Sequence, residues 1–242
     1  MKSRLLFWLL FLPLTVAATE PACEIVIGSS HRPPLSNADG AGIIDALVIE
    51  MFRRIDRRAC ITPLPAERSL LNAESGLTDG DILRIPGVVA SGRYPNLRTV
   101  PEVLYTLPMV GFTRRADLRA KTLADLKPLR VGFVKGWKIL EEKVEAHEIV
   151  LARSADELFG LLAEDKVDLV IYERLTGQAI VQRMNLEGVR VLEPPLLVTP
   201  QFLVLHRRHE ALLEPLAGAL RALKNEGAYE RAFRAAGMSV PR

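Results

Sequence analysis

Cys23-Glu-Ile-Val-Ile-Gly28 and Cys60-Ile-Thr-Pro-Leu64 are two strand-like runs separated by a segment with helical periodicity, residues 43–58. Apolar side chains three and four residues apart form one face of that segment, and charged side chains form the other. The apolar face comprises Ile44, Leu47, Val48, Met51, Phe52 and Ile55. A strand, a helix and a second strand in this order predict a βαβ unit, in which two parallel strands start side by side.

The rest of the chain continues this alternation of strands and helices. Ser154 and Glu157 have the spacing of a capping box at the start of a helix. Proline and glycine residues between positions 86 and 101 predict an irregular stretch. We expect further strands at 79–85, 106–113, 130–135, 167–172 and 201–206, and further helices at 66–75, 137–147, from 154, 175–184, 211–225 and 229–236. This pattern predicts an α/β protein of two lobes.

Composition places the chain among soluble globular proteins. Its 242 residues are 49% hydrophobic and 25% charged, which is too apolar for a disordered chain and long enough to bury a substantial core. Lysine and arginine total 32 against 29 acidic residues, which gives a formal charge of +3. Nucleic-acid-binding proteins carry a basic stripe. The sequence has none, so we expect no nucleic-acid partner.

Residues 1–18 have the parts of a secretory signal peptide. A basic start, Met1-Lys-Ser-Arg4, precedes an apolar run from Leu5 to Val16 that ends in small residues. The run is shorter than the roughly 20 residues that span a bilayer, although an uncleaved membrane anchor is the alternative. Glu20 stands where a lipobox has an aliphatic residue, so we expect no lipid on Cys23. The sequence therefore predicts export to the periplasm, signal cleavage and no membrane insertion of the mature chain.

The sequence has two cysteines, Cys23 and Cys60. An exported protein can hold a disulfide, and the βαβ unit brings these two residues side by side. A bridge would close a loop of about 37 residues and stabilise the fold by roughly 3–4 kcal/mol. Two unpaired buried thiols are the alternative. No pattern indicates a metal site or a cofactor.

Four motifs carry a resemblance to a known family. Gly42-Ile-Ile-Asp-Ala-Leu47 resembles a Gly-Phe-Asp-x-Asp-Leu helix opening, with the first Asp absent. Leu70-Leu-Asn-Ala-Glu-Ser-Gly-Leu-Thr-Asp-Gly80 resembles a leucine-rich helix, small turn and Asp, and Leu123-Ala-Asp-Leu-Lys-Pro-Leu-Arg-Val-Gly-Phe133 resembles an entry into a second lobe. Ala219 to Phe233 resembles a C-terminal Leu-Lys-x-x-Gly-Thr-Tyr signature. The family is that of the type II periplasmic solute-binding proteins, family 3, which includes the amino-acid-binding proteins of ABC importers. The resemblance covers residues 23–237.

The resemblance implies the α/β fold of a two-lobed type II periplasmic binding protein, with each lobe a mixed sheet flanked by helices. Lobe 1 would be discontinuous, residues 22–111 plus 197–242, and lobe 2 would span residues 114–194. Two crossings, near Phe112-Thr113 and Leu196-Leu197, would form the hinge. Such a protein does no chemistry on its ligand and works by closing on it. We therefore expect a monomeric binder of a small polar ligand, an amino acid or another carboxylate, that serves an ABC permease.

The resemblance also implies two kinds of ligand contact. In amino-acid binders an arginine of lobe 1 clamps the carboxylate, because two parallel N–H groups of a guanidinium meet two oxygens. Arg93 is the nearest match to the family's Thr-x-x-Arg position, although its flanking residues differ, and Arg84 lies nearer the end of its strand and is a second candidate. The acid of lobe 2 that receives an ammonium group maps to Glu173. Each arginine could instead be a solvated loop residue, and Glu173 could serve the start of a helix.

Three further residues fall in regions that contact ligand in the family. Trp137 follows Lys135-Gly136 at a strand-to-helix turn, where an indole could cover an apolar part of the ligand or fill the core of lobe 2. His31 lies in the loop after the first strand and Arg68 in the loop after the second, and both could equally be surface residues. If several of these arginines line the interlobe cleft, the ligand is anionic.

Two other functions compete with import. The chain has no Gly-x-Ser-x-Gly, His-Glu-x-x-His, phosphate-loop or dinucleotide motif, and the arginines within His206-Arg-Arg-His209 would repel a metal cation. A lyase of this fold, similar to cyclohexadienyl dehydratase, would use Glu173 and an arginine as acid and base, and we expect it less. The main alternative is a sensory module that presents its ligand to a receptor, because residues 92–101 resemble orphan members of the family more than importer-linked ones.

Overall fold

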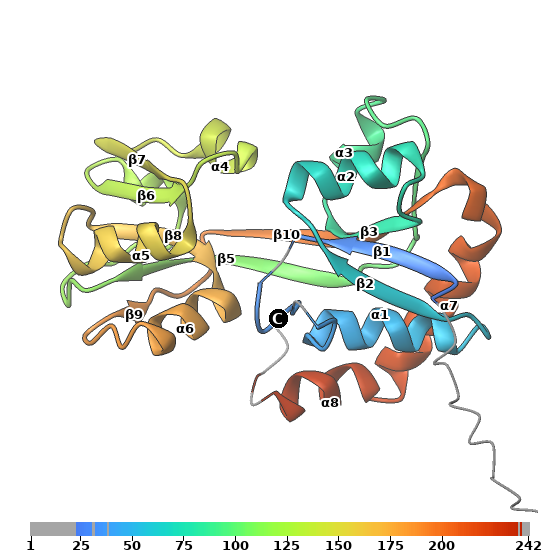
Figure 1. Cartoon of the computed structure of the whole chain (residues 1–242). Coiled ribbons are helices and arrows are strands. Elements are labelled where there is room, and N and C mark those ends of the chain that lie inside the picture. Colours follow the sequence, from blue (N-terminus) through green and yellow to red (C-terminus); the bar gives the residue numbers. More distant parts are fainter. Residues whose placement is uncertain (1–22, 31, 38, 237, 239–242) are drawn as a thin grey trace, which may run out of the picture.

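The chain folds into two lobes joined by a pair of strands (Figure 1). The computed structural model describes residues 23–30, 32–37, 39–236 and 238. The predicted signal peptide and His31 lie outside the described residues. The described strands form one sheet in the order β2-β1-β3-β10-β5-β8-β6-β7, in which β4 also pairs with β10 and β9 also pairs with β5.

Lobe 1 has helices on both faces of its part of the sheet. Helices α2 and α3 cover one face, and α1, α7 and α8 cover the other (Figure 1). Its strands are β1 (Ile25–Ser29), β2 (Ala59–Pro63), β3 (Gly80–Arg84), β4 (Leu97–Thr99) and the second half of β10 (Leu197–His206). Its helices are α1 (Ile43–Arg53), α2 (Ala66–Ser75), α3 (Gly87–Ala90), the 3-10 helix η2 (Arg207–Leu212), α7 (Leu213–Asn225) and α8 (Ala228–Ala235).

Lobe 2 repeats this layered arrangement on a smaller scale. One hydrophobic cluster packs with η1 and α4, and a second packs with α5 and α6. Its strands are the second half of β5 (Tyr105–Thr113), β6 (Arg130–Val134), β7 (Glu148–Ala152), β8 (Leu169–Glu173) and β9 (Arg190–Val191). Its helices are η1 (Leu123–Leu126), α4 (Lys138–Lys143), α5 (Ala155–Ala163) and α6 (Arg174–Arg183).

Strands β5 and β10 carry the chain between the lobes. Residues 105–109 of β5 pair antiparallel with residues 197–201 of β10, and residues 109–112 of β5 pair with β8. Tyr105 belongs to the core of lobe 1, whereas Met109, Val110 and Phe112 belong to the clusters of lobe 2. The chain therefore enters lobe 2 inside β5, between Tyr105 and Met109, and so ahead of residues 112–113, where the sequence suggested the crossing.

Most helices and strands lie where the sequence predicts them. Helix α2 spans Ala66–Ser75 as predicted. Ser154 caps α5, because its hydroxyl oxygen accepts a hydrogen bond from the N–H of Glu157 at 3.2 Å. Helix α1 is shorter than predicted and ends at Arg53.

Two segments correct the sequence prediction. The helix predicted for residues 137–147 ends at Lys143, and residues 148–152, which we assigned to no element, form the edge strand β7. The stretch 86–101, predicted to be irregular, holds α3 and β4. Strand β4 forms because it pairs with residues 204–206 of β10, a contact between distant segments that a local pattern does not show.

Cys23 and Cys60 form the predicted disulfide. Cys60 lies in β2 opposite Val26 of β1, and Cys23 stands just before β1. The two Cα atoms are 5.8 Å apart, within the range that a disulfide spans. The alternative of two unpaired thiols is therefore wrong, and the bridge joins the starts of the two parallel strands.

Arginines hold several carboxylates in their ionised form. Hydrogen bonds from Arg53 lower the pKa of Glu50 to about 2, against the opposing effect of burial and with help from Arg54. Burial alone would raise the pKa of Asp168, but the side chain and N–H of Arg130 bring this pKa below its usual value. Both carboxylates therefore favour the folded state when they are charged.

We expect the free energy of unfolding to fall as the pH is lowered from about 5 to about 2. A carboxyl whose pKa is lower in the folded state stabilises the fold above its unfolded pKa of about 4. That contribution is lost as the pH falls through the folded pKa. Urea unfolding across this range tests the prediction, and Glu50→Gln should make the dependence less steep. A stability that does not change over the range would contradict it.

Candidate functional site

The parallel strands of both lobes point their carboxyl ends at the junction between the lobes. Arg84 at the end of β3 pairs with Phe202 of β10, and Glu173 at the end of β8 pairs with Met109 of β5. Because β3 runs antiparallel to β10 and β8 runs antiparallel to β5, the last residues of β3 and β8 lie beside the segment where β5 and β10 pass between the lobes. Ligands of α/β proteins bind beyond the carboxyl ends of strands. The junction is therefore the candidate site.

Arg84 is bound to a buried aspartate. Its Nε donates to Oδ2 of Asp81 at 2.5 Å, and its Nη2 forms an ion pair with the same oxygen and donates to the carbonyl of Ala66 at 3.0 Å. The hydroxyl of Ser69 donates to Oδ1 of Asp81 at 2.8 Å. The side chain of Asp81 is fully buried and that of Arg84 is 13% exposed. Burial raises the pKa of Asp81, and Arg84 and Ser69 oppose this rise. Arg84 is thus part of a buried network, and its contact with a ligand stays a prediction.

Glu173 caps helix α6. Its carboxylate accepts hydrogen bonds from the N–H of Leu175 at 3.0 Å and from the N–H of Thr176 at 2.7 Å. It also accepts a hydrogen bond from the hydroxyl of Tyr105 at 2.9 Å, and the residue is only 5% exposed. The helix-start role that the sequence offered as the alternative is therefore present. Contact of Glu173 with a ligand stays a prediction.

Trp137 and Tyr172 form an aromatic pair in lobe 2. Their ring centroids are 4.9 Å apart, and Trp137 is half-buried against both hydrophobic clusters of the lobe. Burial raises the pKa of Tyr172 to about 12, the charge of Glu173 adds to the rise, and the guanidinium of Arg32 opposes it. Arg32 belongs to the loop after β1 in lobe 1. A cation of lobe 1 therefore lies within electrostatic reach of the aromatic pair in lobe 2.

Arg68 and Arg93 are exposed on lobe 1. Arg68 lies in the first turn of α2, the helix predicted over residues 66–75, directly after the loop that follows β2, and Arg93 follows α3. The backbone N–H of Arg93 donates to the hydroxyl of Ser91 at 3.2 Å. Within the described part of the chain, neither guanidinium has an ion-pair partner. Both are available to an anion.

Three residues of these networks, Asp81, Ser69 and Tyr105, were not predicted from the sequence. Asp81 carried a signal, because a charged residue inside an apolar strand needs a buried partner and Arg84 stands three residues later. Nothing in the sequence around Tyr105 predicted its role, because its partner Glu173 lies 68 positions later in the chain.

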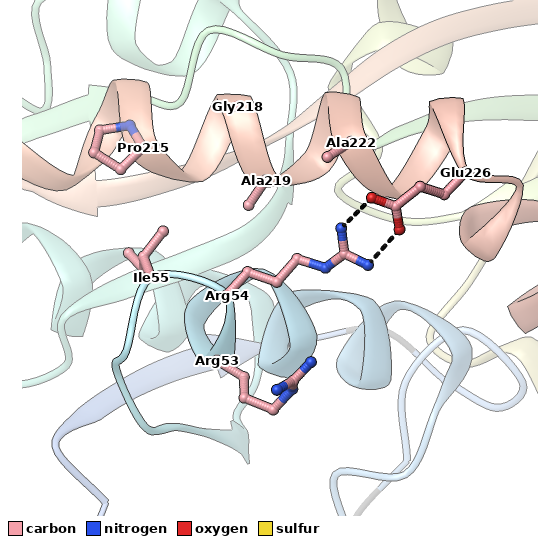
Figure 2. Close-up of a pocket in the computed structure, with 8 residues that line it drawn as sticks. All are labelled: Arg53, Arg54, Ile55, Pro215, Gly218, Ala219, Ala222 and Glu226. Atoms are coloured by element: carbon pink, nitrogen blue, oxygen red, sulfur yellow. Dashed lines mark hydrogen bonds and ion pairs between the residues drawn. The ribbon is translucent and has the colours of Figure 1, made fainter.

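Two surface pockets lie away from the junction. One pocket, of about 540 Å³, lies between the end of α1 and α7. At this pocket Arg54 donates two parallel hydrogen bonds to the carboxylate of Glu226, at 3.0 and 2.8 Å (Figure 2). The other, of about 240 Å³, lies near Arg130 and Asp168 at the opposite end of β8 from Glu173. The arginines that line both pockets are paired with carboxylates. Neither pocket offers an unpaired charge to a ligand.

The described residues hold neither a metal-binding cluster nor a membrane-spanning helix. No group of three or more histidine, cysteine, aspartate or glutamate side chains there could hold a metal ion. His209 instead contacts Asp79, with its Nε2 2.5 Å from Oδ1, and Arg208 pairs with the same carboxylate. Among the described helices, none combines the length and the hydropathy that a bilayer crossing requires.

Sequence comparison gives a distant relative. No protein-family model matches the chain. An uncharacterized protein of Shewanella oneidensis is 25% identical over 181 residues, and the match covers 69% of this chain and 66% of that protein. Membership of solute-binding family 3 therefore stays a prediction.

Several solved structures are similar to this protein over most of its length. A histidine kinase sensor domain with similarity to periplasmic binding proteins has a TM-score of 0.73 at 19% identity, covering 90% of this chain and 97% of that one. The GluR0 ligand-binding core in complex with L-glutamate has a TM-score of 0.74 at 14% identity, covering 88% and 97%. The amino acid ABC transporter substrate-binding protein AbpA from Streptococcus pneumoniae, bound to L-arginine, has a TM-score of 0.68 at 16% identity, covering 88% and 93%. The chain thus has the two-lobed α/β fold of the type II periplasmic binding proteins.

Proposed function

We propose that this protein is an exported solute-binding protein that captures a small polar ligand, an amino acid or another carboxylate, between its two lobes for an ABC importer. The observation that carries the proposal is the junction itself, where strands of both lobes end on either side of two crossing strands. Two of the similar structures named above hold an amino acid, L-glutamate in one and L-arginine in the other. The proposal places the mature chain in the periplasm as a monomer that does no chemistry on its ligand.

Exposed arginines of lobe 1 favour an anionic group on the ligand. Arg68 and Arg93 are exposed without an ion-pair partner among the described residues, and Arg32 lies within electrostatic reach of lobe 2. A guanidinium binds a carboxylate through two parallel N–H groups. The acids of β3 and β8, Asp81 and Glu173, are buried and already accept hydrogen bonds. Recognition of the ligand therefore rests more on its carboxylate than on an ammonium group.

Capture requires the ligand to favour the closed arrangement of the lobes. A ligand shifts such an equilibrium only by its difference in affinity between the two arrangements. Arginines of lobe 1 and the Trp137–Tyr172 pair of lobe 2 would supply that difference, because only a closed arrangement lets one small ligand touch both sets. The crossing strands β5 and β10 would absorb the rotation, as hinges do.

A sensing function is the second candidate. A histidine kinase sensor domain matches 90% of this chain with a TM-score of 0.73, so the same fold serves signalling. Capture of a permease by the ligand-loaded protein supports import, and capture of a sensor kinase supports sensing.

A thermal-shift screen of residues 19–242 against amino acids, mono- and dicarboxylates and polyamines tests the proposal. A ligand present at 100 times its Kd stabilises the folded state by about 2.7 kcal/mol, which raises the melting temperature by several degrees. We expect the carboxylates to give the shift and the polyamines to give none. A panel without any shift would count against the proposed ligand class.

Arg93→Ala should weaken binding of the carboxylate that gives the largest shift. Loss of a charge-assisted hydrogen bond costs about 1.5–3 kcal/mol, or roughly 10- to 150-fold in Kd. Because Arg93 is exposed, the melting temperature of the ligand-free variant should stay that of the wild type. Calorimetric titration measures the change. Arg207→Ala, an exposed arginine of η2 far from the junction, is the matched control and should bind normally. Equal affinities of the two variants would remove Arg93 from the site.

A further inference from the structure

The start of helix α6 connects the two lobes. Glu173 ends β8 and caps α6 within lobe 2, and the same carboxylate accepts the hydroxyl of Tyr105 at 2.9 Å. Leu175, in the first turn of α6, is 4% exposed and packs in the hydrophobic core of lobe 1. One helical turn of lobe 2 is therefore bonded to lobe 1 by a polar contact and an apolar one.

Tyr105 is held firmly on the side of lobe 1. The residue is 1% exposed, and its ring stacks on Phe233 of α8 at a centroid distance of 5.9 Å with the planes 9° apart. One residue earlier in the chain, the carbonyl of Leu104 accepts the hydroxyl of Tyr229 at 2.9 Å. The tyrosine hydroxyl that meets Glu173 thus comes from a fixed ring. Burial, followed by the nearby charge of Glu173, raises the pKa of Tyr105, so its hydroxyl keeps its proton.

Helix α6 is held just as firmly on the side of lobe 2. Gly177 lies against the ring of Phe112, where a Cβ atom would come within 2.3 Å of Cζ. Phe112 is itself fully buried and meets Phe159 of α5 edge to face at 5.2 Å. Because glycine permits this close approach, α6 cannot slide on lobe 2 without breaking the packing. A movement of lobe 2 therefore moves Glu173 and Leu175 with it.

We infer that Tyr105 and Glu173 are positioning residues that set the angle between the lobes. Their hydrogen bond, together with Leu175, ties α6 to lobe 1 beside the crossing strands and restricts the rotation that the strands alone would allow. The inference deepens the proposed function, because the interlobe angle determines how much of a ligand's affinity is used for closure. It assigns Glu173 to the hinge and not to the ligand.

The test is the distribution of interlobe distances without ligand. Spin labels on Ser75→Cys in lobe 1 and Glu187→Cys in lobe 2, both exposed positions, report this distribution by double electron–electron resonance. We expect a single narrow distance in the otherwise unchanged protein. Tyr105→Phe keeps the ring stacked on Phe233 and removes only the hydroxyl, and we expect it to broaden or shift the distribution. Glu173→Gln, which keeps one acceptor oxygen, should have a smaller effect of the same kind.

Tyr229→Phe is the matched control. It removes an equally buried tyrosine hydroxyl whose hydrogen bond, to Leu104, stays inside lobe 1, so it should leave the distance distribution unchanged. The same distribution in Tyr105→Phe and Tyr229→Phe would overturn the inference. If Tyr105→Phe fails to fold, Leu175→Ala decides, because it removes the apolar part of the tie to the core of lobe 1. A broadened or shifted distance distribution in Leu175→Ala supports the inference, and an unchanged distribution overturns it. These measurements need no ligand, so a negative ligand screen leaves them unaffected.

Discussion

Replacing Arg84 with alanine should lower the free energy of unfolding by about 3–5 kcal/mol, because the substitution leaves a buried carboxylate without its cation. Asp81 is fully buried, and in the wild type its Oδ2 receives Arg84 while its Oδ1 receives Ser69. Folded domains have only about 5–15 kcal/mol of stability, so the loss is a large part of the total. Urea unfolding at pH 7 measures it.

The pH dependence of Arg84→Ala separates this cause from lost packing. Without the guanidinium, the pKa of Asp81 should rise further above its unfolded value, so the folded state holds a proton that the unfolded state releases. The variant should therefore lose stability as the pH rises from about 4 toward 8, whereas a packing defect would cost the same at every pH. In Asp81→Leu combined with Arg84→Met, no charge is buried, and much of the lost stability should return. A loss below about 1 kcal/mol in Arg84→Ala would contradict the buried ion pair.

Removing the disulfide should cost about 3–4 kcal/mol. The bridge closes a loop across 37 positions and joins the starts of β1 and β2, so its main effect is to restrict the unfolded chain. Cys23→Ser combined with Cys60→Ser, unfolded in urea, gives the loss directly. Reducing the wild-type protein should give the same loss. If the double variant and the wild type unfold at the same urea concentration, the disulfide contributes nothing to stability.

Much of the fold followed from local patterns. Residues three or four positions apart predicted three features correctly: the apolar face of α1, the bounds of α2 and the Ser154 cap of α5. Strand β7 was missed because its residues have no alternation, and it forms by pairing in parallel with β6. Strand β4 was also missed because it forms by pairing with another strand. Its partner lies in β10, more than a hundred positions away along the chain.

Less of the candidate site than of the fold could be predicted from the sequence. The sequence placed Arg84 and Glu173 at the ends of their strands, and the structure brings both to the junction of the lobes. What it could not show is how these groups are already bonded. Asp81 holds Arg84 inside one lobe, and Tyr105 holds Glu173 from the other lobe. Such pairings depend on tertiary packing, which the sequence does not show. A charged residue at a strand end therefore predicts a ligand site only if the fold does not already pair that charge.

The most direct test of the account is small-angle X-ray scattering of residues 19–242 with and without a saturating amount of the carboxylate that gives the largest thermal shift. Capture between the lobes predicts a smaller radius of gyration in the presence of ligand, because the two lobes turn toward each other about β5 and β10. A ligand that binds and leaves the radius of gyration unchanged would contradict the account, since it would bind without using both lobes.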